Sequence, residues 1–391
     1  MYSWKPRHNA GFLTNADNSP EIEQAFAYGK GRCYGRWIDY ISGSARSNGH
    51  DQGDLIEEPG GIIESILRDE IFTERDLTIT SSTAVNNFAC DELRSSVDGY
   101  YIYAEFFNVT TGHKSWCNGY TGLTHSFSIQ DSDASMSAGD NIFITNIQGD
   151  NKINYQSFDI VGNTTDGNRK DWKCARSIYN EIYAKDLIDS LLYESRLILF
   201  TSDNQYKIKS ISDIDSSVDT WTTPLIDQRN SNYMASFGLT HITQLYNDYK
   251  INYHFDYGSQ QYKRSLFVNK SNCSSGLTNG STYKTICKSL YDTYGIQNKY
   301  EYNCDWINDD ATAELFFNAI VDRYSKQRLF GTWATNVSEF IQYEVGDQII
   351  LNNSKLIPAG INNVETFVIY EDPAAIFPAS PYINFKLLQI S

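Results

Sequence analysis

Histidine, cysteine and aspartate side chains at short spacings can bind metal ions. His113 and Cys117 are the nearest approach to a ligand pair, because the six histidines show no His-x-His or His-x-x-x-His spacing. Asp131 with Asp133, and residues 48–54 (NGHDQGD), could offer carboxylate oxygens to Ca²⁺, but neither stretch has a Glu at the position that completes a calcium loop. We therefore expect surface loops at these positions and no metal site.

Paired carboxylates could carry the acid–base chemistry of glycoside hydrolysis. Asp309 with Asp310, and Glu57 with Glu58, are such pairs. Each precedes an expected helix, where carboxylates more often cap the first turn or face the positive end of the dipole. Residues 29–35 (GKGRCYG) have the glycines of a phosphate loop, but the residues that follow do not continue as a helix. With no Gly-x-Ser-x-Gly motif either, the sequence predicts no catalytic residue, no cofactor and no enzyme.

Aromatic side chains raise a different function, sugar binding, because their faces stack on pyranose rings. The chain has 28 tyrosines and seven tryptophans. Trp116, Tyr120 and Tyr100 are the candidates for such a surface. The competing interpretation is that these are ordinary strand residues, half-buried on a pleated surface, and we favour it.

The composition indicates a folded protein that avoids polyanions. The formal net charge is −16 and the isoelectric point is near 4.8, which disfavours binding to nucleic acid or to an anionic membrane surface. No apolar run reaches the roughly 18 residues of a membrane helix, and no secretory signal is visible, so we expect a soluble protein made in the cytosol. The seven cysteines include no Cys-x-x-Cys pair, which favours reduced and mostly buried thiols. With 391 residues, more than one domain is expected.

Four helices are predicted from apolar stripes at helical spacing and from capping residues. The stripes are Ile62, Ile63, Ile66 and Leu67; Val85, Phe88, Ala89 and Leu93, in a helix starting near Ser82; Ala184, Leu187, Ile188, Leu191 and Leu192, in a helix over 177–195; and Ala313, Phe316, Phe317, Ile320 and Tyr324, in a helix starting near Asn308 and Asp309.

Most of the remaining chain has the alternation of strands. The predicted strands are 100–107, 141–147, 249–257, 262–268, 366–372 and 383–390, together with a hairpin whose strands flank the turn residues 202–204. The polar stretches 162–171 and 271–283 are the candidate linkers or long loops. The fold class is therefore α+β with β structure dominant, divided into 1–97, 98–170, 171–305 and 306–391.

A second hairpin tip is predicted at residues 344–347 (EVGD). Gly346 suits a turn position with positive φ, and Asp347 can accept hydrogen bonds from neighbouring backbone amides. Strands are expected at 329–336, 339–345 and 348–352, with the apolar face of the helix that starts near Asp309 laid across them.

The order of these segments resembles the central hub proteins of tail tips and baseplates in long-tailed bacteriophages. Typical of that family are a strand with alternating polar and aromatic residues (here 247–268), a helix ending in a tyrosine and basic residues (306–336), and a Glu-x-Gly-Asp hairpin (343–351). Residues 58–70 and 184–211 resemble further segments of the same family. Residues 1–54 are shorter than the family's leading part, and 98–170 resemble a β-rich insertion.

The resemblance implies a structural protein rather than an enzyme. It implies a homotrimer that closes the distal end of the tail tube and contacts the tail tube, distal tail, tape-measure and tail-fibre proteins. Such a protein would be made in the host cytoplasm and located at the tail tip of the virion. The alternative function is a glycan-binding or receptor-binding tail component that uses residues 98–170. A glycoside hydrolase is the least favoured function.

Overall fold

The computed structural model divides the chain into two compact units. One contains Met1–Leu192 and Asp203–Lys207, and the other contains Tyr193–Ser202 and Ile208–Ser391. The described residues are 32–34, 36–37, 55–56, 59–84, 86–91, 93, 95–111, 114–130, 136–154, 157–158, 172–178, 182–210, 219–222, 235–336, 343–352, 364–374 and 382–389. We call the two units the first unit and the second unit, in that order. The four-segment division predicted from the sequence stays a prediction.

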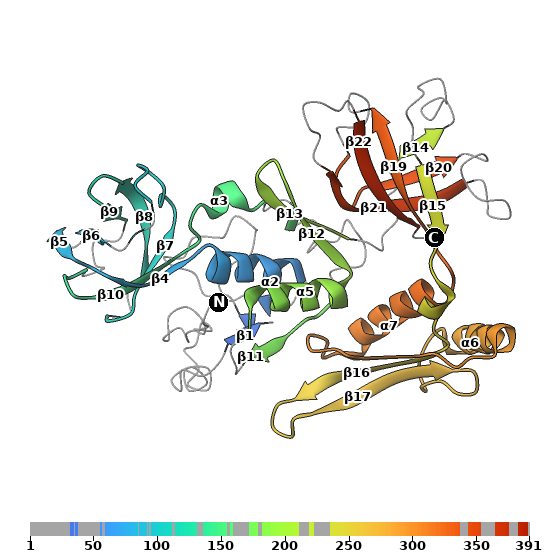
Figure 1. The fold of residues 1–391 in the computed structure, drawn as a ribbon. Helices are drawn as coiled ribbons and strands as arrows, with labels where there is room; N and C mark the ends of the chain where they lie inside the picture. The colour runs from blue at the N-terminus through green and yellow to red at the C-terminus, as the bar shows by residue number, and fades with distance from the viewer. Residues whose placement is uncertain are drawn as a thin grey trace. The chain divides into compact units, whose positions relative to one another are not determined.

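A seven-stranded sheet forms most of the first unit and curls around its own core (Figure 1). The strand order is β4-β10-β7-β8-β9-β6-β5. In chain order the strands are β4 (Glu74–Thr78), β5 (Ser81–Ala84), β6 (Asn87–Ala89), β7 (Glu105–Asn108), β8 (Lys114–Thr121), β9 (Ser126–Ile129) and β10 (Asn141–Thr145). Neighbouring strands are antiparallel. Buried residues of β6, β7, β9 and β10 contribute to the core, whereas all four residues of β5 are exposed.

The described part of the first unit also contains helical segments and short strand pairs. They are α2 (Pro59–Ile66), the π-helix η1 (Leu67–Ile71), α3 (Gly149–Lys152), and the pairs β1 (Arg32–Tyr34) with β11 (Arg176–Ile178) and β2 (Arg36–Trp37) with β3 (Leu55–Ile56). The helix predicted after Pro59 is confirmed, and its whole predicted stripe from Ile62 to Leu67 is buried.

The predicted helix near Ser82 is wrong, because this segment forms the antiparallel pair β5–β6. Phe88 and Cys90, two residues apart, are both buried, which is the period of a strand and not of a helix. The Ser82 hydroxyl donates to the backbone oxygen of Met136 at 2.7 Å instead of capping a helix. The predicted strand at 100–107 is also too long, because residues 98–103 form turns and β7 begins at Glu105.

The predicted helix over 177–195 begins later than expected. It is α5 (Ala184–Ser195), because Arg176–Ile178 pair with β1 as a strand instead. The hairpin that follows is confirmed as β12 (Leu197–Ser202) and β13 (Gln205–Ser210), with Asp203 and Asn204 at positive φ in the turn. Its residues divide between the two units.

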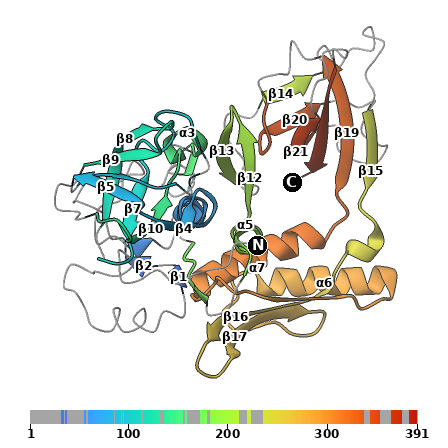
Figure 2. The same ribbon diagram turned by 60° about the vertical axis from the view of Figure 1, so that its left-hand side comes forward.

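In the second unit a three-stranded sheet carries two helices on one face (Figures 1 and 2). The strands, in the order β17-β16-β18, are β16 (Asp248–Asp256), β17 (Gln261–Asn269) and β18 (Lys299–Asn303). The helices are α6 (Gly280–Tyr294) and α7 (Asp310–Tyr324). The stretch 271–283 is therefore only partly a loop. Helix α6, in which the buried Tyr283 and Cys287 lie one turn apart, was not predicted from the sequence.

A six-stranded sheet forms the rest of the second unit, in the order β14-β20-β21-β22-β19-β15. Its strands are β14 (Asp219–Thr222), β15 (Ala235–Leu239), β19 (Leu329–Asn336), β20 (Gln348–Asn352), β21 (Val364–Ala374) and β22 (Tyr382–Gln389). A short 3-10 helix, η3 (Ile242–Gln244), follows β15. The predicted strand 366–372 is confirmed within β21, and 383–390 is confirmed as far as Gln389, where β22 and the described residues end.

The expected packing of α7 over the 344–347 hairpin is wrong. The helix lies against β16 and β17, and the Phe316 ring contacts Tyr302 of β18 with 5.8 Å between centroids. β20 pairs with β21 and β14, while most of the expected partner strand 339–345 lies outside the described residues. The class predicted from the sequence, α+β with β structure dominant, is confirmed.

Candidate interaction sites

The Asp309–Asp310 pair lies at the start of α7, and both carboxylates make structural contacts there. Asp309 accepts hydrogen bonds from the backbone N–H groups of Ala311 and Thr312 at 2.9 and 3.0 Å, so it is the predicted cap. Asp310 accepts from the Tyr253 hydroxyl at 2.6 Å and pairs with Arg264 at 2.7 Å. The hydrogen bond from Tyr253 and the Arg264 charge hold the pKa of Asp310 below its ordinary value, so it stays an anion and a poor general acid.

The predicted loops that could bind metal or phosphate fall largely outside the described residues. These are His113, Asp131, Asp133, residues 48–54, and residues 29–35 apart from Arg32–Tyr34, which form β1. The carboxylate pair Glu57 and Glu58 and the candidate linker 162–171 also lie outside the described residues. Over the described ranges, no three His, Cys, Asp or Glu side chains lie close enough to hold a metal ion. In the same ranges no helix is long and apolar enough to cross a membrane. Six cysteines are free thiols, and all but Cys273 are buried: Cys90, Cys117, Cys174, Cys273, Cys287 and Cys304.

The aromatic candidates for sugar stacking do not form a shared exposed surface. Tyr120 is buried and its hydroxyl donates to the Ser95 backbone oxygen at 2.5 Å. The cause is a β-bulge in β8, where the register against β9 shifts by one residue between Cys117 and Gly119. This extra residue turns Tyr120 inward, onto the same face as the buried Cys117. Burial raises the pKa of Tyr120 to about 12.

Trp116 and Tyr100 are half-buried. The nearby Tyr103, in the turn before β7, is exposed. Its side chain is 62% exposed and its φ is +66°. Its backbone N–H donates to the Cys117 oxygen at 2.8 Å, which holds the strained residue in place. Nothing in the sequence pattern distinguishes Tyr103 from Tyr101, which is fully buried.

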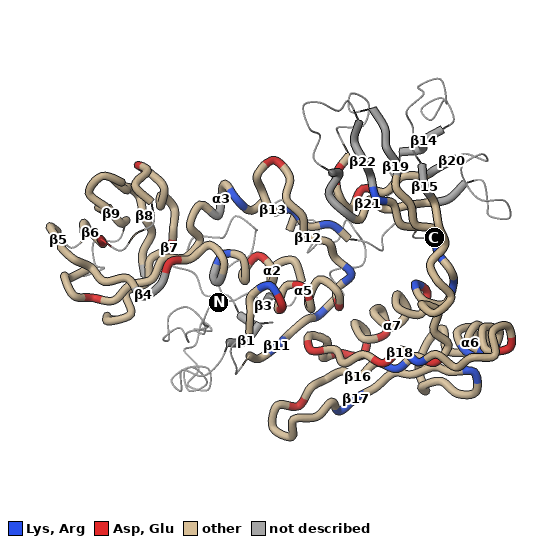
Figure 3. Tube along the Cα trace, in the orientation of Figure 1, with Lys and Arg blue, Asp and Glu red and all other residues tan. Residues whose placement is uncertain are grey.

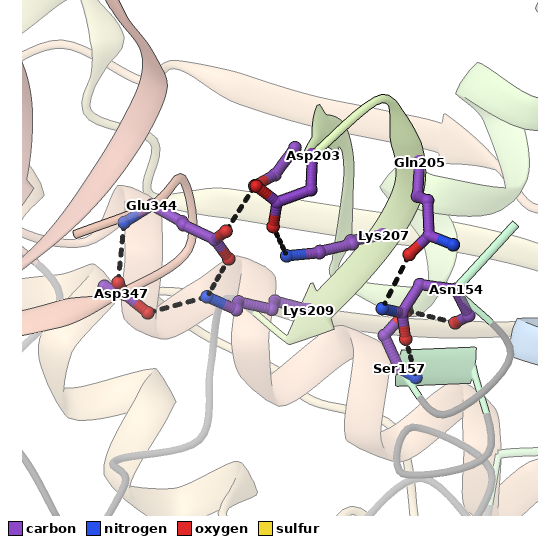
Figure 4. Close-up of polar contacts among 9 residues, drawn as sticks. Asn154, Ser157, Asp203, Gln205, Lys207, Lys209, Glu344 and Asp347 are labelled. Atoms are coloured by element: carbon purple, nitrogen blue, oxygen red, sulfur yellow. Dashed lines mark hydrogen bonds and ion pairs between the residues drawn. The ribbon is translucent and has the colours of Figure 1, made fainter. Parts of the chain in front are cut away.

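A lysine of the β12–β13 hairpin forms ion pairs with two carboxylates of the 344–347 turn, within the second unit (Figure 4). Lys209 Nζ lies 2.7 Å from Asp347 Oδ1 and 3.5 Å from Glu344 Oε2. Asp347 also accepts from the Glu344 backbone N–H at 2.7 Å, as the sequence analysis predicted. Gly346 has φ +84°, and a Cβ there would lie 2.9 Å from the Lys209 side chain. The predicted turn is confirmed, but its lysine partner was not foreseen.

A separate polar group belongs to the first unit (Figure 4). The Asn154 amide donates to Gln205 Oε1 at 3.2 Å, and its Oδ1 accepts from the Ser157 backbone N–H at 3.1 Å. Lys152 Nζ donates to Asn204 Oδ1 at 3.0 Å. These contacts join the turn of the hairpin to Lys152 and Asn154 by hydrogen bonds.

The face of the three-stranded sheet opposite α6 and α7 is polar and carries both signs of charge (Figure 3). Glu301 accepts from Lys299 at 2.6 Å and from Lys250 at 3.1 Å. These two cations, Lys299 first, lower the pKa of Glu301 to about 2. Asn252 and Asn303 lie directly opposite each other in the register and are joined at 2.8 Å. This cross-strand ladder holds β16 and β18 in register.

Comparison with known proteins gives structural similarity only. No family model and no curated protein sequence matches the chain. Similar solved structures include the prophage tail protein gp18 of Listeria monocytogenes EGD-e, at 15% identity and TM-score 0.28 over 54% of this chain and 53% of that one. A tail protein of Neisseria meningitidis MC58 has 9% identity and TM-score 0.30, over 54% of this chain and 55% of that one. The chain thus spans about half the length of either protein.

A third structure is the 43 kDa tail protein of prophage MuSo2 from Shewanella oneidensis. It has 9% identity and TM-score 0.31, over 81% of this chain and 94% of that one. These identities and TM-scores are too low to establish a shared fold or function.

Proposed function

We propose that the protein is a structural component of a bacteriophage tail, acting as the hub that closes the distal end of the tail tube. It would assemble as a homotrimer and contact the tail tube, distal tail, tape-measure and tail-fibre proteins at the tail tip of the virion. No chemical step is part of this role. The observation that carries the proposal is the order of segments at 247–268, 306–336 and 343–351, which resembles the hub family.

The described structure supports this proposal because each of these segments is a regular element. The first contains the antiparallel pair β16–β17, the second contains α7 and β19, and the third contains the turn at Gly346 and most of β20. Two sheets in one unit, each with edge strands, suit an assembly protein, because pairing or ring closure removes exposed edges. A net charge of −16 also favours a tube end through which DNA slides without being bound.

The first test is the native mass of the purified chain, combined with negative-stain imaging. A species of three copies with a central hole is expected. A chain that stays monomeric at all concentrations would contradict ring formation by this chain alone. It would limit the hub role to assembly on a preformed tail.

The alternative function, binding of a host glycan or receptor, is favoured by one observation, the exposed Tyr103, whose backbone N–H donates to the residue that follows the half-buried Trp116. Glycan-array binding that is lost in Tyr103→Ala and in Trp116→Ala would support it. Tyr183→Ala is the control, because Tyr183 is 47% exposed but lies at the start of α5 and outside that surface. An empty array with the wild-type trimer would contradict glycan binding and leave the structural role standing.

A further inference from the structure

One segment of the second unit has the opposite charge to the rest of the chain. Residues 257–300 contain six Lys or Arg side chains and one carboxylate, Asp292, although the formal net charge of the whole chain is −16. This basic segment forms β17, α6, which packs against β17, and the start of β18 (Figure 3). Charge asymmetry between parts of a chain is a sequence signal of an interaction surface.

Half of these cations are neutralised within the second unit. The pairs are Lys263 with Asp256 at 3.2 Å, Arg264 with Asp310 at 2.7 Å and Lys299 with Glu301 at 2.6 Å. The other three cations are Lys270, Lys284 and Lys288, and none of them forms an ion pair with a residue that the structure describes. The positive charge that remains unpaired is therefore concentrated on α6 and just before it.

The three unpaired lysines form one surface together with Tyr291. Lys284, Lys288 and Tyr291 are spaced by four and three residues, so they lie on the same face of α6. Lys270 directly follows β17, and its Nζ lies 3.2 Å from the centroid of the Tyr291 ring. Lys284 and Lys288 are exposed, whereas Lys270 and Tyr291 are half-buried. We call these four residues the α6 lysine face.

The stability of α6 does not account for this arrangement. Lys284 and Lys288 lie four residues apart, where like charges on a helix repel each other. Both precede Asp292, which is in the last turn, so the order of charges is the reverse of the one that the helix dipole favours. The first turn has no acidic residue to compensate. Local rules of this kind are most often broken at functional sites.

Few carboxylates lie near the α6 lysine face. Asp292 directly follows Tyr291 and is exposed. Glu314 and Asp322 act on the buried Tyr283, and Asp248 acts on the buried Cys287, so these three carboxylates lie toward the packed side of α6. Glu314 also accepts a hydrogen bond from the Thr278 backbone N–H at 2.7 Å. The exposed side of the helix therefore keeps an excess of positive charge.

We propose that the α6 lysine face binds an acidic segment of another protein, whose carboxylates pair with Lys270, Lys284 and Lys288. Charge complementarity of this kind raises the rate and the specificity of association. Nucleic acid is a poorer match, because three lysines neutralise only a few phosphates and the rest of the acidic chain repels a polyanion. The inference does not depend on ring formation by this chain.

The test measures binding of a fluorescein-labelled oligoglutamate peptide to the full chain by fluorescence anisotropy, at low and at physiological salt. Lys284→Gln and Lys288→Gln should each weaken binding by about 3-fold, and the double variant by about 10-fold, because exposed charge pairs are lost. The difference should shrink at the higher salt concentration. Lys284→Arg with Lys288→Arg keeps both charges and should bind as the wild type does. Lys185→Gln removes an exposed lysine of α5 and is the matched control.

The melting temperature of each variant shows that it is folded, so a loss of binding can be assigned to charge. A wild-type chain that does not bind the peptide would overturn the proposal, as would a double variant that binds equally well or a control that is weakened to the same extent. Tighter binding of a short DNA duplex than of the peptide would also overturn it. A double variant that is monomeric where the wild type is oligomeric would mean that a second copy occupies the face, and not a separate partner. The hub proposal is tested separately by the native mass of the wild type.

Discussion

The cores of the two units both rely on aromatic side chains, but they hold them in different ways. In the core of the seven-stranded sheet the rings of Phe88, Phe106 and Phe127 contact one another directly, with centroids 4.7 to 5.5 Å apart. In the core beneath α7 the tyrosines are joined through their hydroxyls as well, and Tyr193 and Tyr300 lie 2.6 Å apart, oxygen to oxygen. The first core also holds buried tyrosine hydroxyls, because Tyr101 donates to Glu74 at 2.7 Å and Tyr120 donates to the Ser95 backbone oxygen at 2.5 Å.

A buried carboxylate completes the contrast. Glu194 is fully buried and accepts hydrogen bonds from the backbone N–H groups of Asp305 and Trp306, each at 2.9 Å. It therefore fixes the end of α5 against the segment between β18 and α7. The phenylalanines of the first core should tolerate exchange for hydrophobic residues of similar volume, whereas the contact at the end of α5 depends on the oxygens of Glu194.

The largest effect is expected where α7 loses a ring. Phe316→Ala should lower the free energy of unfolding by about 3 to 5 kcal/mol, because the side chain is fully buried and leaves a cavity. Phe127→Ala should cost a similar amount in the first unit. Leu315→Ala is the matched control on α7, because Leu315 is only half-buried and should cost less. Chemical denaturation measures all three, and an unchanged stability for Phe316→Ala would contradict the packing of α7 on the sheet.

Removing the buried carboxylate tests the polar half of the comparison. Glu194→Ala should cost about 2 to 4 kcal/mol, since two buried backbone N–H groups lose their acceptor. Glu194→Gln keeps one acceptor oxygen and should cost less. Amide hydrogen exchange at Asp305 and Trp306 should accelerate in Glu194→Ala. Equal losses in both variants would mean that the side chain matters for its volume and not for its oxygens.

A smaller effect is expected at the 344–347 turn, which is paired with Lys209. Gly346→Val should cost about 1 to 3 kcal/mol, because a β-branched residue is strained at positive φ and its Cβ would displace Lys209. Gly276→Val is the matched control, since Gly276 has φ +88° but nothing within 4 Å of a Cβ. The difference between the two losses in melting temperature measures the contribution of the contact with Lys209. If the two glycines respond alike, strain explains the whole effect.

These sites also show how far the sequence could be interpreted. Local patterns predicted β16, β17, the cap at Asp309 and the turn at Gly346, because alternation, capping and positive φ are set by neighbouring residues. The pairing of Lys209 with Asp347 joins residues 138 positions apart, and no local pattern contains it. The same limit explains the wrong partner given to α7, since an apolar stripe does not say which sheet it meets.

The error near Ser82 and the burial of Tyr120, which no local pattern predicted, have a related cause. The apolar residues near Ser82 fit helical spacing, but the strand partners of Phe88 were decisive. At Tyr120 a one-residue bulge reversed the face of the side chain. The helix α6 was missed because it buries only Gly280, Tyr283 and Cys287, too narrow a stripe to stand out among Ser, Thr and Asn.

The smallest effect at neutral pH, and the most specific to the tyrosine core, is its response to alkali. Burial raises the pKa values of Tyr193, Tyr300 and Tyr302 above the ordinary value of 10.0. The folded state thus keeps protons that the unfolded chain releases, so this stability is complete below about pH 10 and is lost as pH rises toward the folded pKa values. Tyr302→Phe should make the fall in unfolding free energy between about pH 9 and pH 12 shallower, because one such group is gone. Tyr183→Phe, which changes an exposed tyrosine, should leave the slope as in the wild type. A slope that Tyr302→Phe does not change would mean that the alkaline response arises elsewhere, with Tyr101 and Tyr120 of the first core as the next residues to substitute.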